Sequence, residues 1–254
     1  MKFSLNLVRK HLSVGVFLLS LTSISSANAG VVLVGTRVIL PNGQNEKTIY
    51  LQNKDNKPAL VQVWLDAGDE NSTLDTTKAP FVVNPQIFRM EGNASQIVRL
   101  RYLGVDTDSD SKESLYYLNF IQYPSVKVNE TAVDNNRLMI VFKNRIKVFV
   151  RPKKINSFMS SSQAMEKLDF SFSPTKKVVV VNNPTPYFAN IQEIGLKTGN
   201  QYVVLTQNKM VEPNSTLKLD VKKSNYLQKD SKIKFVLVND YGVPVEQSKS
   251  IAFD

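Results

Sequence analysis

Few side chains in this sequence could carry out chemistry, because the chain has no cysteine and a single histidine, His11. Ser-His-Asp and Cys-His catalysis, thiol redox reactions and the usual zinc sites need residues that are missing after His11. Carboxylates remain, and paired acids could hydrolyse glycosides. They gather in two clusters: Asp66, Asp69 and Glu70, and then Asp106, Asp108 and Asp110. The second cluster lacks the Gly and final Glu of a calcium loop, so we interpret both as solvated loop charges and expect no enzyme, metal or cofactor site.

The N-terminus has the pattern of a secretory signal peptide. Three basic residues precede an apolar run, and small residues suited to cleavage follow it: Lys2, Arg9 and Lys10, then Val14–Leu21, then Ala27–Ala29. A bilayer-spanning helix takes roughly 20 residues, and no segment of the chain approaches that length. We therefore expect a cleaved segment at residues 1–29, secretion, and no membrane insertion.

The net charge of +10 does not by itself indicate a nucleic-acid partner. Lysines are spread over both halves of the chain, and export removes it from most nucleic acid. We interpret the charge as a solvated surface that keeps the protein soluble, with no nucleic acid bound.

Segments rich in β-branched and aromatic residues recur at short intervals after residue 30, and no long stretch has a helical period. A first series of expected strands is Val31–Ile39, Lys47–Asn53, Leu60–Leu65, Gln86–Met90, Gln96–Tyr102, Leu115–Tyr123 and Leu138–Val150. A second series is Leu168–Phe172, Lys177–Asn182, Phe188–Leu196, Tyr202–Leu205, Leu217–Val221, Lys232–Asn239 and Val245–Phe253. Pro152 separates the two series. The sequence predicts an all-β protein of two sandwiches, with domains at 30–151 and 152–254.

The longest expected strand, Leu138–Val150, is apolar on both faces. Leu138, Ile140 and Phe142 share one side by their period of two, while Met139 and Val141 share the other. A central strand buried on both faces would explain this pattern. The alternative is a strand with one face exposed as an apolar row beside an open sheet edge, which proteins suppress unless they use it.

Six runs in this order resemble the periplasmic pilus chaperones of the chaperone-usher pathway, the PapD-like family. The runs are Thr36–Ile39, Pro80–Met90, Glu113–Phe120, Arg145–Pro152, Asn183–Phe188 and Asn239–Gly242. The resemblance covers nearly all of the chain after residue 29. It implies two immunoglobulin-like sandwiches around a cleft, and a periplasmic protein that binds pilus or fimbrial subunits and delivers them to an outer-membrane usher.

The resemblance also implies roles for particular residues. Leu138, Ile140 and Phe142 would complete the subunit's sandwich as a donor strand. Arg37 and Lys147 would anchor the carboxylate at the subunit's C-terminus. A further set would form an interdomain salt bridge: Glu113, Arg151 and Asp240. Because exposed salt bridges contribute about 0 to 1 kcal/mol, we expect that bridge to set domain orientation rather than stability.

Some features depart from this simple picture. Lys147 has the opposite parity to Leu138, Ile140 and Phe142, and a bulge, bend or strong twist would reconcile them. The family often has two prolines at Pro85-Gln86, and the stretch from Pro124 to Leu138 is longer than in short-loop members but lacks the cysteines of long-loop members. The fibre type, the identity of the subunit, and self-association of the free protein stay open. A secreted carbohydrate-binding or carbohydrate-active sandwich protein is the alternative function, and an adhesin subunit is a third.

Overall fold

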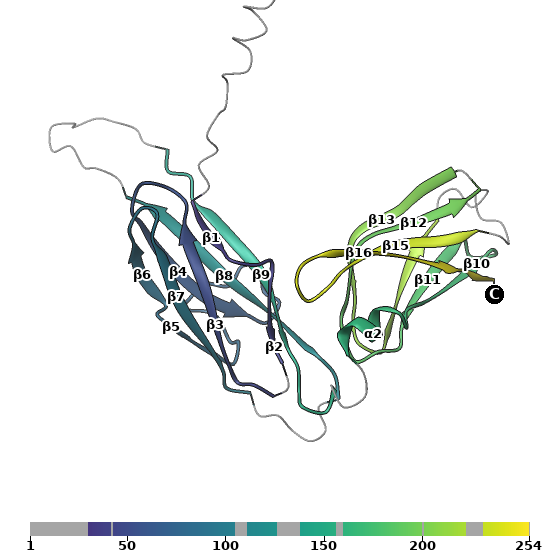
Figure 1. Cartoon of the computed structure of the whole chain (residues 1–254), viewed down its shortest axis with the longest axis horizontal. Helices are drawn as coiled ribbons and strands as arrows, with labels where there is room; N and C mark the ends of the chain where they lie inside the picture. The colour runs from purple at the N-terminus through teal and green to yellow at the C-terminus, as the bar shows by residue number, and fades with distance from the viewer. Residues whose placement is uncertain are drawn as a thin grey trace, which may run out of the picture.

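The described residues of the computed structural model form two β-sandwiches, which Figure 1 shows as two lobes. The structure describes residues 30–41, 43–104, 111–125, 138–155, 160–199, 201–221 and 231–253. The expected signal peptide at 1–29 lies outside these ranges, as do Asp106, Asp108 and Asp110. The predicted fold class, an all-β chain of two sandwiches, is confirmed.

The first sandwich packs two antiparallel-rich sheets face to face. Its strands are β1 (Val31–Leu33), β2 (Arg37–Leu40), β3 (Glu46–Asn53), β4 (Ala59–Asp66), β5 (Phe81–Asn84), β6 (Ile87–Met90), β7 (Ser95–Tyr102), β8 (Ser114–Pro124) and β9 (Phe142–Val150). One sheet has the order β1-β3-β7-β5 and the other the order β2-β9-β8-β4-β6. The prediction omitted the short β5. The Asn84–Pro85 peptide bond between β5 and β6 is cis.

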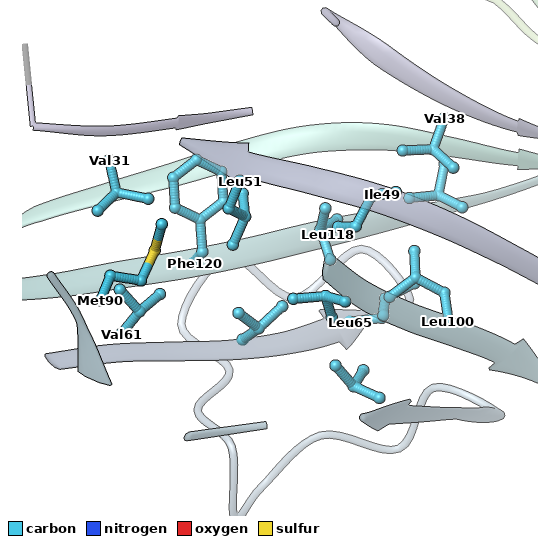
Figure 2. Packing of buried hydrophobic residues seen from close by; sticks show 14 of the residues in the cluster. Val31, Val38, Ile49, Leu51, Val61, Leu65, Met90, Leu100, Leu118 and Phe120 are labelled. Carbon is cyan, nitrogen blue, oxygen red and sulfur yellow. The ribbon is translucent and has the colours of Figure 1, made fainter. Parts of the chain in front are cut away.

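Alternation along these strands builds the core of the first sandwich. Leu51 of β3 and Leu100 of β7 are fully buried in one sheet, while Val61 of β4 and Leu118 of β8 are fully buried in the other. Figure 2 shows these side chains meeting between the two sheets, together with Phe120. Because successive side chains of a strand point to opposite faces, the residues between them are left on the outer faces.

The first expected strand, Val31–Ile39, is in fact two strands. β1 pairs with β3 in one sheet, and β2 pairs with β9 in the other, so the chain changes sheets between them. Gly35, with a φ of +118°, lies in this crossing, where a residue with a Cβ would be strained. The prediction missed this break because apolar residues typical of strands stand on both sides of it, from Val31 to Val34 and again at Val38 and Ile39.

The last strand of the first sandwich is shorter than predicted. It begins at Phe142, not at Leu138, and its ladder with β8 ends at the pair Phe142–Gln122. Continuing the same register would place Ile140 opposite Pro124, which has no backbone N–H to donate. Hydrophobicity alone therefore overestimated the strand, because it does not report whether a pairing partner is available.

The second sandwich follows the same plan with one short helix. Its elements are α2 (Ser161–Met165), β10 (Asp169–Ser173), β11 (Val178–Asn183), β12 (Ala189–Thr198), β13 (Gln201–Val211), β14 (Ser215–Asp220), β15 (Lys232–Val238), β16 (Pro244–Ser250) and β17 (Ala252–Phe253). The sheets have the orders β14-β11-β10-β17 and β13-β12-β15-β16. The helix was not predicted, although Ser160 and Gln163 form a capping box at its start. In Figure 1 the turn between β15 and β16 points toward the first sandwich.

Candidate functional site

One edge of β9 is partly open. β8 pairs with β9 from Phe142 to Val150, but on the opposite edge β2 pairs only with Lys147–Val150, in parallel. Among the described residues, no strand covers that edge from Phe142 to Ile146. Backbone N–H and C=O groups along it are therefore available to another strand.

An exposed apolar stretch leads directly into this open edge. The exposed fractions are 89% for Leu138, 61% for Ile140 and 63% for Phe142, and 51% for Met139 and 38% for Val141 on the other parity. These values contradict the interpretation of a strand buried on both faces for residues 138–142, whereas Val148, Phe149 and Val150 at the other end are buried on both faces. Five consecutive exposed apolar side chains beside an unpaired edge are an aggregation hazard unless a partner covers them.

The two faces of β9 have different surroundings. Val148 and Val150 are buried in the core of the first sandwich, and Ile146 packs against it. Phe149, on the opposite face, packs against Phe188 of the second sandwich with ring centroids 6.0 Å apart. The registers of β9 with β8 and β2 run without a shift, so no bulge separates Phe142 from Lys147. Lys147 therefore shares the parity of Phe149 and faces the second sandwich, away from the side of Phe142.

Arg37 and Lys147 lie side by side as partners in the parallel β2–β9 pair. Both side chains are held from the second sandwich: Arg37 Nη1 donates to the Val238 carbonyl at 3.0 Å, and Lys147 Nζ donates to Asn190 Oδ1 at 2.8 Å. The Arg37 Nε is buried and has no hydrogen-bond partner among the described residues. Arg37 and Lys147 line a cleft of about 290 Å³ together with residues of β12, β13 and β15, among them a third cation, Lys209.

The electrostatics of this cleft favour an anion. Burial lowers the pKa of Lys147, and the neighbouring Arg37 charge lowers it further. Burial likewise lowers the pKa of Arg37, although Asp240 and Glu113 oppose that effect. Two adjacent, partly desolvated cations repel each other, and a carboxylate between them would relieve the repulsion through charge-assisted hydrogen bonds. The cleft can therefore bind a carboxylate.

A buried ion network lies beside the cleft. Arg151 donates from Nε to Glu113 Oε1 at 2.7 Å, and from Nη1 and Nη2 to the two Asp240 oxygens, also at 2.7 Å. The side chains of Arg151 and Glu113 are only 9% and 2% exposed. The Phe188 backbone N–H donates to the other Glu113 oxygen, Oε2, and the Ser161 hydroxyl donates to Asp240 Oδ2, which also accepts from Arg151 Nη1. The bridge is therefore not the exposed pair on which our expectation of a small stability contribution rested. Removing one member of a buried network leaves a charge uncompensated.

Comparisons with known proteins agree with this geometry. Residues 30–156 match the family described as pili and flagellar-assembly chaperone, PapD N-terminal domain, and residues 163–249 match the C-terminal domain of PapD pili assembly chaperones. The chain belongs to the pilus-assembly chaperone family. This confirms the resemblance seen in the sequence.

Individual relatives of this chaperone cover most of its length. The chaperone protein HifB of Haemophilus influenzae is 38% identical over 222 residues, which are 87% of this chain and 88% of HifB. The chaperone YadV of Escherichia coli is 31% identical over 238 residues, 93% and 96% of the two chains. The crystal structure of the CupB2 chaperone of Pseudomonas aeruginosa superposes with a TM-score of 0.72 at 28% identity, over 87% of this chain and all of that one.

In the acidic cluster near the end of β4, Asp69 and Glu70 are exposed as expected, but Asp66 of the chaperone is not the solvated charge that we expected. The Asp66 side chain is only 1% exposed and accepts bonds from Arg145 Nη2 at 2.7 Å, Arg145 Nε at 3.2 Å and Asn119 Nδ2 at 2.6 Å. The Arg145 guanidinium also lies 3.5 Å above the Tyr117 ring. Burial would raise the pKa of Asp66, but the bonds from Arg145 and Asn119 bring it below its ordinary value. Glu70 of the same cluster is 80% exposed, as predicted.

The described part of the chaperone shows neither a group of side chains that could hold a metal ion nor a helix that could span a membrane. Within those residues, no group of three His, Cys, Asp or Glu side chains is arranged to hold a metal ion. No helix there has the length and hydropathy needed to cross a membrane.

Sequence reasoning missed Asn190 and Val238, the two acceptors for Lys147 and Arg37. An asparagine and a backbone carbonyl at strand positions carry no sequence pattern that distinguishes them.

Proposed function

We propose that this chain is a periplasmic chaperone, exported by a signal peptide at residues 1–29, which binds pilus subunits by donor-strand complementation and passes them to an outer-membrane usher. Residues 30–151 would be the subunit-binding domain and 152–254 the second domain. The observation that carries the proposal is the open edge of β9, which runs from an exposed apolar stretch to a cationic cleft. The proposed role is stoichiometric binding without catalytic turnover.

The donor row consists of Leu138, Ile140 and Phe142. A pilus subunit that lacks one strand of its sandwich has a groove into its own core, and these side chains fill that groove. Backbone hydrogen bonds along Phe142–Ile146 provide affinity that tolerates sequence differences, while the pockets for alternate side chains provide selectivity. Binding also buries these three side chains away from water, whereas in the free chaperone no described residue covers them.

Arg37 and Lys147 anchor the carboxylate at the C-terminus of the subunit. Since β2 already occupies the edge of β9 from Lys147 onward, an incoming strand takes the edge that precedes it. With its C-terminus held at Lys147, that strand runs in the same direction as β9. The anchor thus fixes both the register and the parallel orientation of the added strand.

The ion network of Glu113, Arg151 and Asp240 holds the angle between the two sandwiches, and so the width of the cleft. Arg151 follows β9 directly, Glu113 precedes β8, and Asp240 follows β15. Arg151 and Glu113 thus lie at one end of the sheet that contains the donor strand, whereas Asp240 belongs to the second sandwich. The network therefore connects the sheet to the domain that supplies acceptors to Arg37 and Lys147.

A peptide titration tests the anchor. Two synthetic peptides would carry the C-terminal strand of the pilin from the same gene cluster, one with a free carboxylate and one amidated. We expect Lys147→Met to weaken binding of the free-acid peptide by about 1.5 to 3 kcal/mol, roughly 10- to 150-fold, because a hydrogen bond to a charged group is lost.

The amidated peptide is the matched control for this titration. It should bind weakly to the unmodified chaperone, and Lys147→Met should change its affinity little. Equal affinities of the two peptides for the unmodified chaperone would refute the anchor. If Lys147→Met left the affinity for the free-acid peptide unchanged, Lys147 would not be part of the anchor.

A further inference from the structure

The two cations of the proposed anchor share an unusual arrangement: both belong to the first sandwich, but both are held by acceptors of the second. The Val238 carbonyl accepts from Arg37 at 3.0 Å, and the Asn190 side-chain oxygen accepts from Lys147 at 2.8 Å. The carbonyl belongs to the backbone and is fixed by β15. The asparagine is the one of these two acceptors that a side-chain substitution can remove.

Asn190 occupies a rigid position opposite β9. It comes two residues after Phe188, which packs on Phe149, and directly before Ile191, which is buried in the core of the second sandwich. Alternation along β12 turns Asn190 to the face opposite Ile191. Two aromatic rings and a core residue therefore fix the backbone that presents this amide to Lys147.

Lys147 needs such a partner more than an exposed lysine would. Its side chain is half-buried beside Arg37, and both burial and the neighbouring charge disfavour the ammonium. A lysine side chain is long and flexible and carries three donors. Without an acceptor in the cleft, the ammonium would turn away from Arg37 toward solvent and widen the gap that a carboxylate has to bridge.

We infer that Asn190 is a positioning residue of the subunit site: it holds the Lys147 ammonium across the cleft, so that Lys147 and Arg37 converge on one carboxylate. The inference rests on the proposed function, and it assigns part of the anchor to the second domain. A neutral amide suits this role, because its oxygen accepts from the ammonium without cancelling the positive charge that attracts the carboxylate.

A double-mutant cycle with the same two peptides tests this role. Asn190→Leu removes the acceptor at similar volume, and we expect it to weaken the free-acid peptide about fivefold, since the contact it disturbs involves a charged group. In a Lys147→Met background the same substitution should have no further effect, because Asn190 acts through Lys147. Gln201→Leu is the matched control: Gln201 is an exposed amide of β13 that does not line the cleft, so its replacement should leave the affinity unchanged.

The outcomes separate the two proposals. The positioning role would be overturned, while the anchor stands, if Asn190→Leu left the affinity for the free-acid peptide unchanged. It would also be overturned if Asn190→Leu lowered affinity equally in the Lys147→Met background, or lowered the affinity for the amidated peptide equally. No effect of Lys147→Met on the free-acid peptide would instead refute the anchor itself. Thermal unfolding midpoints of all variants should match, and a lowered midpoint in Asn190→Leu alone would show that the amide serves the fold rather than the site.

Discussion

Replacing Ile140 by alanine separates the donor row from its neighbours on the opposite face. Ile140 is 61% exposed, so free chaperone has already buried about two fifths of this side chain. Full burial of an isoleucine contributes about 1.5 to 3 kcal/mol, and the share still available on binding is therefore about 1 to 2 kcal/mol. This corresponds to a roughly 5- to 30-fold loss of affinity for a subunit whose groove accepts Ile140.

The assay uses the complex of the chaperone with the pilin of the same gene cluster, purified from the periplasm. Unmodified and variant chaperones compete for this pilin, and the dissociation of each complex is measured. Met139→Ala is the matched control, because Met139 is 51% exposed on the opposite parity and should change affinity little. The free Ile140→Ala chaperone should unfold within about 0.5 kcal/mol of the unmodified protein, as exposed positions usually do.

Two results would refute this reasoning. Equal losses of pilin affinity from Ile140→Ala and Met139→Ala would show that the subunit does not contact one face of the strand selectively. A marked drop in the unfolding midpoint of free Ile140→Ala would show that Ile140 belongs to the core of the chaperone.

The remaining predictions concern the two ion networks. Arg151→Met leaves Glu113 buried without its partner and should cost about 3 kcal/mol in urea unfolding, with a changed domain angle in solution scattering; an unchanged scattering curve would argue against the orienting role. Asp66 has a lowered pKa when folded, so its contribution is present above its unfolded pKa and is lost as the pH falls below about 4. Asp66→Asn should therefore be less stable at neutral pH, with a flatter stability profile on acidification; parallel profiles would contradict this.

Strand identity was largely predictable from the sequence, because the apolar alternation of strands such as β4 and β7 follows directly from which face is buried. Strand ends and sheet membership were less so. The sheet change at Gly35 depends on backbone conformation, and the start of β9 depends on Pro124 in a different strand. A pattern read along one segment contains neither piece of information.

For the candidate site, the resemblance to a family supplied Arg37, Lys147 and the charged triad, whose residue types alone look like ordinary surface charges. Burial is what the sequence did not reveal. Asp66 and Glu113 were expected among solvated or exposed groups, yet each lies against an arginine in a closed environment. Asn190 was missed for a related reason, since its importance comes from a lysine 43 positions away along the chain.

The short length of β2 has a practical consequence for finding partners, because it fixes the distance along β9 between the carboxylate anchor and the apolar row. β2 pairs with β9 from Lys147 onward. Phe142, the member of the apolar row nearest to Lys147, lies five residues before it, about 16 Å away at roughly 3.3 Å per residue. Under the proposed binding mode, a cognate pilin has groove pockets spaced about 7 Å apart, the nearest about 16 Å from its own terminal carboxylate. Candidate pilins can be ranked by that spacing before any complex is made.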